Sequence, residues 1–229
     1  MKLVIGNKNY SSWSLRPWLL LSHLAIPFEE EKLSFSDPEF KLRVGRYSPV
    51  GKVPVLIDGD VVIWDTLAIV EYLAETFPER GIWPGDRVAR ARARSISAEI
   101  HAGFSALRNL LPMNCELKVD WVPRDLRVQR DIARIIESWS DCRARFGAGG
   151  PFLFGAFSAA DAFYAPVVRR FLGFDVKLPD VAAKYVATMD ALPAMRAWVT
   201  AALAEHEFVE MDEPYREPPV ASRKYTALP

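Results

Sequence analysis

The sequence predicts an α/β domain at the N-terminus and an all-α domain, a helical bundle, at the C-terminus. Short β patterns alternate with helical patterns up to residue 78, whereas strand patterns nearly vanish beyond residue 86. The length of 229 residues agrees with one or two domains. We expect an α/β domain over 1–78, a linker over 79–85, a helical domain over 86–208 and an irregular tail over 209–229.

The N-terminal elements are expected in the order β-α-β-(α)-β-β-α. Short apolar runs indicate strands, and apolar residues spaced three and four positions apart indicate helices. Asp58-Gly59 is a hairpin signal between two apolar runs, and Pro78 ends the last helix of this half. The expected strands are 2–6, 28–35, 53–58 and 61–64, and the expected helices are 15–25 and 66–77.

The C-terminal half contains helical patterns with clear boundaries. Asp86 is suited to cap the first helix, and Pro112 is suited to stop it. Ser158 and Asp161 form an S-x-x-D capping box at the start of a later helix, which we interpret as structural. The expected helices are 86–111, 124–146, 158–171, 181–191 and 194–207.

The composition excludes several classes of function. Lysine plus arginine equals aspartate plus glutamate, so the net charge of zero argues against a nucleic-acid binder. No apolar run approaches the ~20 residues of a membrane span, and the N-terminus turns polar too early for a signal peptide. The two cysteines and three histidines lack metal-ligand spacing. We therefore expect a cytoplasmic protein with no membrane, nucleic-acid or metal partner.

Three serines precede the first predicted helix. Ser14, or alternatively Ser12, is expected to be the N-cap of that helix. A serine hydroxyl can instead donate a hydrogen bond to a thiolate, which lowers a thiol pKa from its reference of ~8.5. Arg16 lies close in sequence and adds positive potential for such a thiolate. The sequence alone leaves open which hydroxyl has which task.

Proline in Val53-Pro54 lies between two strand-like apolar residues. Proline cannot donate to a sheet ladder, so its presence here is unusual. A cis peptide bond would turn the chain just before the strand. The backbone groups of residue 53 would then be exposed at a strand edge, where a peptide-like ligand can pair with them.

Asp65-Thr66 begins another predicted helix. Aspartate is among the best N-cap residues, so a purely structural role is one interpretation. A helix N-terminus also holds a carboxylate, because its N–H groups are free and its dipole is positive there. Asp65 could accept a hydrogen bond from an ammonium group. The pair is therefore also suited to the two charged groups on the α-carbon of an amino acid.

These features occur in an order that resembles the cytosolic glutathione transferase superfamily, and in particular its serine-type, zeta-like bacterial members. The resembling stretches are "NYSSWSLRPWLLL", "SPVGKVPVLIDGDVVIWDTLAIVEYL" and "FSAADAFYAP", and the resemblance extends over residues 1–208. It implies a thioredoxin-like N-terminal domain, an all-helical C-terminal domain and the glutathione transferase fold. It also implies glutathione as cosubstrate, no metal, and a homodimer.

The resemblance assigns roles to the polar residues near the first helix. Ser11 matches the first serine of the zeta-like stretch and is our choice for stabilising the glutathione thiolate. Ser12 and Ser14 are the alternatives, and Arg16 is expected near the bound glutathione.

The remaining glutathione contacts are expected from two later motifs. Val53, beside a cis Pro54, matches the backbone that pairs with the cysteinyl part of glutathione. Asp65 and Thr66 match the Glu-Ser pair that holds the γ-glutamyl end, although Asp65 is one methylene shorter than glutamate. Lys52 is placed to reach the glycine carboxylate or the backbone of the tripeptide.

The second substrate is expected to face residues from both halves of the chain. Trp13 stands where zeta-type enzymes usually have cysteine, which puts maleylacetoacetate isomerase activity in doubt. Residues 99–114 resemble the helix that faces the active-site cleft in bacterial members, with His101, Phe104 and Arg108 toward the second substrate. His101 is almost as well explained as a half-buried structural histidine.

The leading hypothesis is a glutathione transferase that joins the glutathione thiolate to a small electrophile held between the domains. One alternative is a glutathione-dependent cis-trans isomerase of the maleylacetoacetate type, with substrate carboxylates bound by Arg16 and Arg108. The other alternative is a non-catalytic binding module with the same fold.

Overall fold

The computed structural model describes residues 1–120, 122 and 124–216. The N-terminal domain is built on a four-stranded mixed sheet with the strand order β2-β1-β3-β4. Strand β1 pairs in parallel with β2 and antiparallel with β3, which forms a hairpin with β4. The strands are β1 (Lys2–Ile5), β2 (Glu29–Lys32), β3 (Val55–Asp58) and β4 (Val61–Trp64). The expected strands and the hairpin at Asp58-Gly59 are therefore confirmed.

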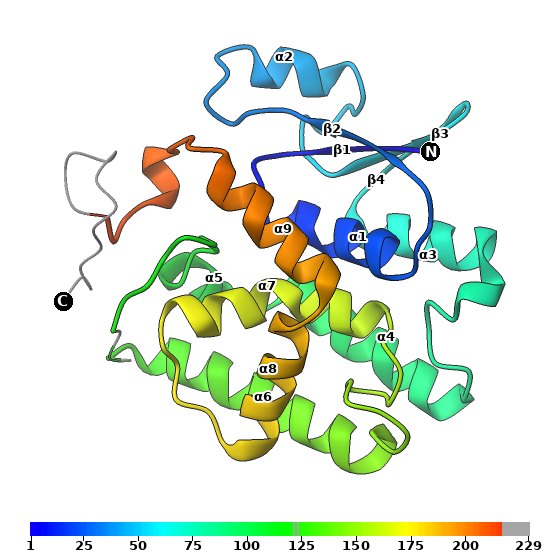
Figure 1. The fold of residues 1–229 in the computed structure, drawn as a ribbon, viewed down its shortest axis with the longest axis vertical. Helices are drawn as coiled ribbons and strands as arrows, with labels where there is room; N and C mark the ends of the chain where they lie inside the picture. Colours follow the sequence, from blue (N-terminus) through cyan, green and yellow to red (C-terminus); the bar gives the residue numbers. More distant parts are fainter. Residues whose placement is uncertain (121, 123, 217–229) are drawn as a thin grey trace.

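Three helices accompany the sheet: α1 (Ser12–His23), α2 (Phe40–Gly45) and α3 (Thr66–Thr76). Helices α1 and α3 lie between the sheet and the helical domain, whereas α2 lies on the other side of the sheet (Figure 1). This arrangement points the N-termini of α1 and α3 toward the region where the two domains meet. The short turn η1 (Pro78–Arg80) then leads to the helical domain.

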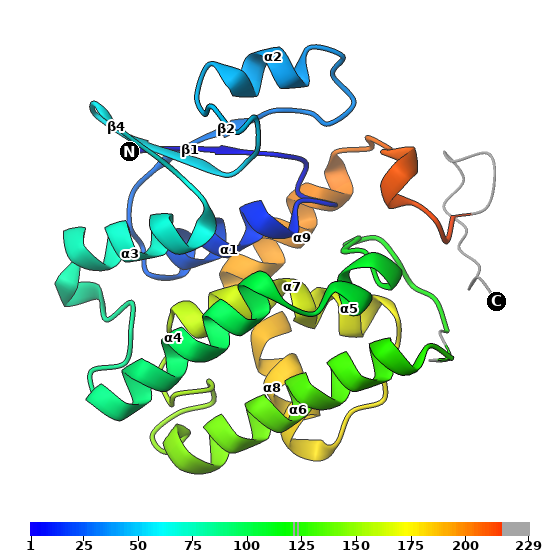
Figure 2. The ribbon, with the colours of Figure 1, turned by 180° about the vertical axis from the view of Figure 1, so that it is seen from behind.

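The helical domain surrounds one central helix, α7 (Ala159–Gly173), which packs against α1 and α4 (Figure 2). Nearly every side chain of α7 is buried, and its apolar residues belong to a hydrophobic core that continues into the N-terminal domain. The other helices are α4 (Arg87–Ala102), α5 (Ser105–Leu110), α6 (Leu126–Phe146), α8 (Asp180–Asp190) and α9 (Pro193–Ala204). The domains are thus held together by a shared core.

The predicted capping box at the start of α7 is present. Asp161 is fully buried and accepts hydrogen bonds from the backbone N–H of Ser158 at 2.9 Å and of Leu153 at 3.1 Å. The hydroxyl groups of Ser158 and Tyr185 donate to the same carboxyl at 3.2 and 3.0 Å. Asp161 therefore joins the start of α7 to the preceding loop and to α8.

The prediction of one helix over 86–111 is wrong, because the chain forms α4 and α5 with a break between them. Phe104 adopts a left-handed conformation with φ of 59°, and a β-carbon at Gly103 would lie 2.9 Å from the carbonyl oxygen of Glu99. Arg108 folds back and donates hydrogen bonds to the carbonyl groups of Ile100, His101 and Gly103. These bonds satisfy the end of α4, where a continuous helix would have used backbone N–H groups.

The tail expected over 209–229 is described only as far as residue 216. This part contains the 3-10 turn η2 (Glu210–Asp212), and residues 217–229 lie outside the described part of the chain. No described helix is long and apolar enough to cross a membrane. The predicted limits of the two domains and their linker stay predictions.

Candidate active site

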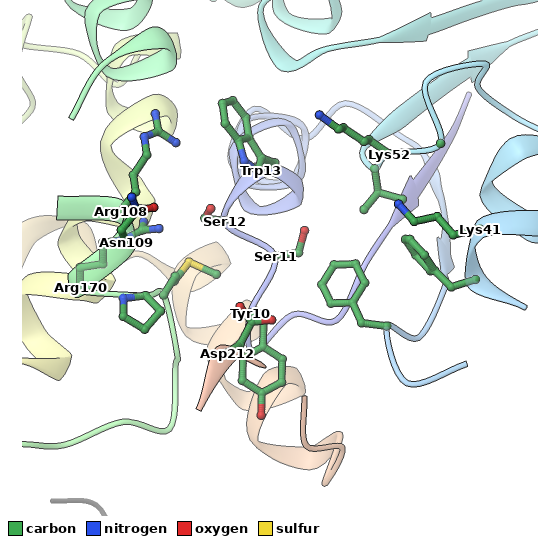
Figure 3. A pocket seen from close by; sticks show the side chains of 16 residues that line it. Tyr10, Ser11, Ser12, Trp13, Lys41, Lys52, Arg108, Asn109, Arg170 and Asp212 are labelled. Atoms are coloured by element: carbon green, nitrogen blue, oxygen red, sulfur yellow. The ribbon is translucent and has the colours of Figure 1, made fainter. Parts of the chain in front are cut away.

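Two cavities adjoin the N-terminus of α1, and the larger of them also reaches the helical domain. The larger, the serine cavity, has a volume of about 480 Å³, and the smaller, the Asp65 cavity, has a volume of about 420 Å³. Trp13, Lys52 and Val53 line both cavities. The serine cavity is also lined by Tyr10, Ser11, Ser12, Lys41, Arg108, Arg170 and Asp212 (Figure 3). The Asp65 cavity is also lined by Pro54, Trp64, Asp65 and Thr66.

The N-cap of α1 is Ser11, so the expected cap at Ser14 or Ser12 is wrong. The Ser11 hydroxyl oxygen accepts the backbone N–H of Ser14 at 3.3 Å, and the two hydroxyl oxygens lie 2.7 Å apart. The helix starts before Ser14 because Ser14 itself is fully buried and accepts the N–H of Gly6 at 3.1 Å. Ser14 lines neither cavity, whereas Ser11 caps α1 and faces the serine cavity at once.

Ser12 also faces the serine cavity. Within the described part of the chain, its hydroxyl makes no hydrogen bond that would compete with a ligand. Figure 3 shows Ser11 and Ser12 between Lys41 and Lys52 on one side and Arg108 on the other. The two serines therefore lie between cationic side chains, an environment that favours a thiolate.

Carboxylates from the C-terminal segment hold the loop that precedes Ser11. Glu205 accepts the backbone N–H groups of Lys8 at 2.8 Å and of Asn9 at 3.3 Å. Glu213 accepts the Tyr10 hydroxyl at 2.6 Å. These contacts join residues about 200 positions apart in the sequence. The C-terminal segment therefore fixes the loop that positions Ser11.

We expect Glu205→Gln to lower the free energy of unfolding by about 1–3 kcal/mol, because an N–H₂ group replaces one accepting oxygen and leaves one of the two backbone N–H groups without an acceptor. The loop before Ser11 should then move, and the turnover number should fall as well. Denaturant unfolding and steady-state kinetics measure the two effects. Glu210→Gln is the control, because Glu210 is exposed in the same segment. Equal behaviour of both variants would contradict this role of Glu205.

The Val53-Pro54 peptide bond is cis, as expected. Val53 lies between the two cavities and lines both, and Pro54 lines the Asp65 cavity. Strand pairing begins only at Val55, which is opposite Trp64 in the register of β3 and β4. Residue 53 is therefore placed beside the cavities and outside the sheet ladder, where an extended ligand can reach its backbone.

Asp65, Thr66 and His101 form a cluster at the N-terminus of α3. Asp65 caps α3 by accepting the backbone N–H of Leu67 at 2.8 Å, as predicted. Its other carboxylate oxygen lies 3.1 Å from Nε2 of His101, and the Thr66 hydroxyl oxygen lies 3.3 Å from Nδ1 of the same ring. His101 thus contacts Asp65 and Thr66, the two residues that the resemblance assigns to glutathione binding. It was expected to face the second substrate.

The buried Arg16 and Arg170 and the half-buried Arg108 form a cluster of guanidinium groups. Burial lowers the pKa of Arg16 well below its ordinary value, and the charges of Arg108 and Arg170 lower it further. Burial also lowers the pKa of Arg170 to about 9, with a smaller contribution from Arg108. Arg16 lies under the ring of Trp13 at 4.2 Å, and two of its nitrogens, Nε and Nη1, have no hydrogen-bond partner within the described residues. Since Arg108 and Arg170 line the serine cavity, the positive potential of this cluster favours an anion there.

The other expected residues are placed as follows. Arg108 lines the serine cavity, whereas Arg16 and Phe104 are buried and line neither cavity. Sequence reasoning missed Arg170 and Asp212, which line the serine cavity from α7 and from η2. Arg170 lies on an almost completely buried helix, where a charged residue is unusual, and this signal could have indicated it.

The fold and the cleft define a two-domain architecture in which a thioredoxin-like domain and a helical domain enclose a polar, cationic site. Residues 10–76 match the family model "Glutathione S-transferase, N-terminal domain", and residues 120–201 match "Glutathione S-transferase, C-terminal domain". The chain is 33% identical to glutathione S-transferase 1 of Dianthus caryophyllus over 191 residues, which are 79% of this chain and 81% of that protein. The chain belongs to the glutathione S-transferase family.

Two further similar proteins are named as isomerases, and one of them is described as a zeta-class transferase. A probable maleylacetoacetate isomerase of Caenorhabditis elegans is 35% identical over 99 residues, 43% of this chain and 45% of that protein. The fold is also that of a bacterial maleyl pyruvate isomerase described as a zeta-class glutathione S-transferase, with a TM-score of 0.67 at 21% identity. That match covers 88% of this chain and 98% of the solved chain.

Proposed function

We propose that this protein is a glutathione transferase that joins the thiolate of glutathione to a small electrophile. The observation that carries the proposal is the meeting of three features around two adjoining cavities. These are the serine-rich start of α1, the backbone of residue 53 beside a cis-proline, and the N-terminus of α3. Together they match a thiol, a peptide group and the charged end of an amino acid.

Glutathione is proposed to lie extended along Val53. Its γ-glutamyl carboxylate is proposed to lie at the N-terminus of α3, where the helix dipole is positive, and its ammonium group at Asp65. Asp65 has an exposed carboxylate that keeps lone pairs free beyond its present contacts. Lys41 and Lys52 line the opposite part of the serine cavity and suit the glycine carboxylate.

The sulfur is proposed to lie at Ser11. The Ser11 hydroxyl is proposed to turn from Ser14 toward the sulfur and to donate a hydrogen bond to the thiolate, which favours ionisation at neutral pH. The nearby arginines add positive potential. The thiolate then attacks the electrophile in the serine cavity, so that a carbon–sulfur bond forms as the leaving group departs with its electron pair.

We expect Ser11→Ala to reduce the turnover number by about 10²–10³, the usual effect of losing one donor to a developing or full anion. The thiol pKa of bound glutathione should rise, as followed by thiolate absorbance against pH. Ser11 also caps α1, so the variant should lose about 1 kcal/mol of stability and still fold.

Ser12→Ala is the matched control, because Ser12 lines the same cavity without capping the helix. It should keep a nearly normal thiol pKa. A normal thiol pKa in Ser11→Ala together with a raised one in Ser12→Ala would move the role to Ser12.

A second candidate function is a glutathione-dependent isomerase acting on a maleyl-type acid. The cluster of Arg16, Arg108 and Arg170 favours it, since these guanidinium groups form no ion pair with a carboxylate among the described residues and suit an anionic substrate. In this reaction the thiolate adds to a double bond, the single bond rotates, and elimination returns the thiolate. The name of the Caenorhabditis elegans relative supports the same reaction.

The proposal extends to the assembly and location of the protein. A homodimer is supported by the exposed apolar side chains of Val61, Val62 and Trp64 on the edge strand β4. A small electrophile as second substrate is supported by the size of the serine cavity. A cytoplasmic location and the division of the chain at residues 79–85 are proposed on the sequence alone.

A further inference from the structure

His101 connects the helical domain to the N-terminus of α3. It lies on the last turn of α4, its side chain is only 18% exposed, and its two ring nitrogens have different partners. Nε2 lies 3.1 Å from a carboxylate oxygen of Asp65, and Nδ1 lies 3.3 Å from the hydroxyl oxygen of Thr66. The ring also packs edge-on against Trp13, with ring centroids 5.0 Å apart.

These contacts select one form of the imidazole. A carboxylate only accepts hydrogen bonds, so Nε2 must carry the proton that it shares with Asp65. A neutral ring has a single N–H, so Nδ1 accepts the hydroxyl proton of Thr66. One neutral tautomer therefore satisfies both partners, and it fixes the direction of each hydrogen bond.

The neighbours of His101 keep this ring neutral. Burial lowers its pKa, and the guanidinium groups of Arg16 on α1 and Arg108 on α5 lower it further, whereas Asp65 on α3 opposes them. Helix α7 contributes the uncharged ring of Phe163, whose centroid is 6.2 Å away.

We infer that His101 is a positioning residue of the γ-glutamyl subsite, where its neutral imidazole orients the Asp65 carboxylate and the Thr66 hydroxyl toward the bound ligand. The inference rests on the proposed glutathione site and adds a contribution of the helical domain to it. His101 lines neither cavity, so it acts through these two side chains. Asp65 in particular has a short side chain at a backbone φ of 75°, and the ring restricts where its second oxygen points.

Protonation of His101 is expected to weaken the subsite. An imidazolium has an N–H on both nitrogens, so Nδ1 can no longer accept the Thr66 hydroxyl proton. Its full charge also competes with the ligand ammonium group for Asp65. Ligand affinity should therefore fall as the pH is lowered below the ordinary histidine pKa of about 6.5.

The test is calorimetric titration of the full-length protein with S-methylglutathione, which has no ionisable thiol. His101→Leu removes both ring contacts and should raise the dissociation constant about tenfold, with a smaller change in turnover number. His101→Gln can accept from Thr66 and donate to Asp65, so it should restore most of the affinity. It should also lose the fall in affinity that the wild type shows below about pH 6.5.

His23→Gln is the control, because His23 is a partly buried histidine on α1 that packs against Phe157, away from this cluster. It should bind like the wild type. Normal affinity in His101→Leu, equal losses in His101→Leu and His101→Gln, or a wild-type affinity independent of pH would each overturn the inference. Failure of the wild type to bind S-methylglutathione at all would overturn the proposed function first, and the inference with it.

Discussion

Asp161→Ala is expected to destabilise the folded protein by about 3–5 kcal/mol, because several buried donors lose their acceptor at about 1–3 kcal/mol each. The substitution leaves the N–H groups of Leu153 and Ser158 and the hydroxyl of Tyr185 without their acceptor in a fully buried site. Helix α7 joins both domains, so this loss should affect the whole fold. Denaturant unfolding followed by circular dichroism measures it.

Asp86→Ala is the matched control. Asp86 also caps a helix, α4, by accepting the N–H groups of Val88 and Ala89. Unlike Asp161, Asp86 is exposed to solvent. It should cost only about 1 kcal/mol, as caps usually do. Similar losses in both variants would show that burial of Asp161 adds nothing to its capping role.

The pH dependence of Asp161 has a definite sign. Burial raises its pKa to about 6 from an ordinary 3.8. Stability linked to this group is therefore complete below pH 3.8 and is lost as the pH rises through about 6. Since asparagine does not titrate, the stability of Asp161→Asn relative to the wild type should improve over that interval.

Arg16→Met is expected to stabilise the protein by about 1–3 kcal/mol while lowering its activity. Arg16 is almost fully buried, its Nε and Nη1 have no partner among the described residues, and Arg108 and Arg170 repel it. Methionine fills a similar volume without a charge. The loss of positive potential should raise the thiol pKa of bound glutathione by about one unit and reduce the thiolate fraction about tenfold.

Arg87→Met is the control for this prediction, because it removes an exposed arginine that lines neither cavity. It should show neither the gain in stability nor the change in thiol pKa. Thermal unfolding without ligand and the pH dependence of turnover measure the two effects separately. A destabilised Arg16→Met with unchanged thiol pKa would show that Arg16 serves packing and not the site.

Much of the fold could be predicted from the sequence because its signals are local. Apolar spacing of two or of three and four residues distinguishes strands from helices within a single element. The caps at Asp65 and Asp86 and the box at Ser158 depend on residues two or three positions apart. The cis bond at Pro54 was indicated by a proline next to a strand.

The site was predicted where its residues form sequence motifs. Ser11 lines the serine cavity, Asp65 and Thr66 line the Asp65 cavity, and Lys52 and Val53 line both, whereas their roles toward a ligand stay predictions. The cap of α1 was placed on the wrong serine, since the three hydroxyls are equivalent by sequence spacing. In the folded protein the buried Ser14 hydroxyl accepts the N–H of Gly6, and Ser11 accepts the N–H of Ser14 as the cap.

By itself, the sequence determined the order of the N-terminal strands and helices and the helix starts at Asp65, Asp86 and Ser158. It also predicted which residues would approach a tripeptide thiol. The tertiary structure alone decided that Glu205 and Glu213 hold the loop before Ser11, that Arg170 enters the cleft, and that His101 turns toward Asp65. The physical reason is distance along the chain. These contacts join residues that no periodicity or capping rule relates, and packing of α7 against α1 and α4 brings the two domains together.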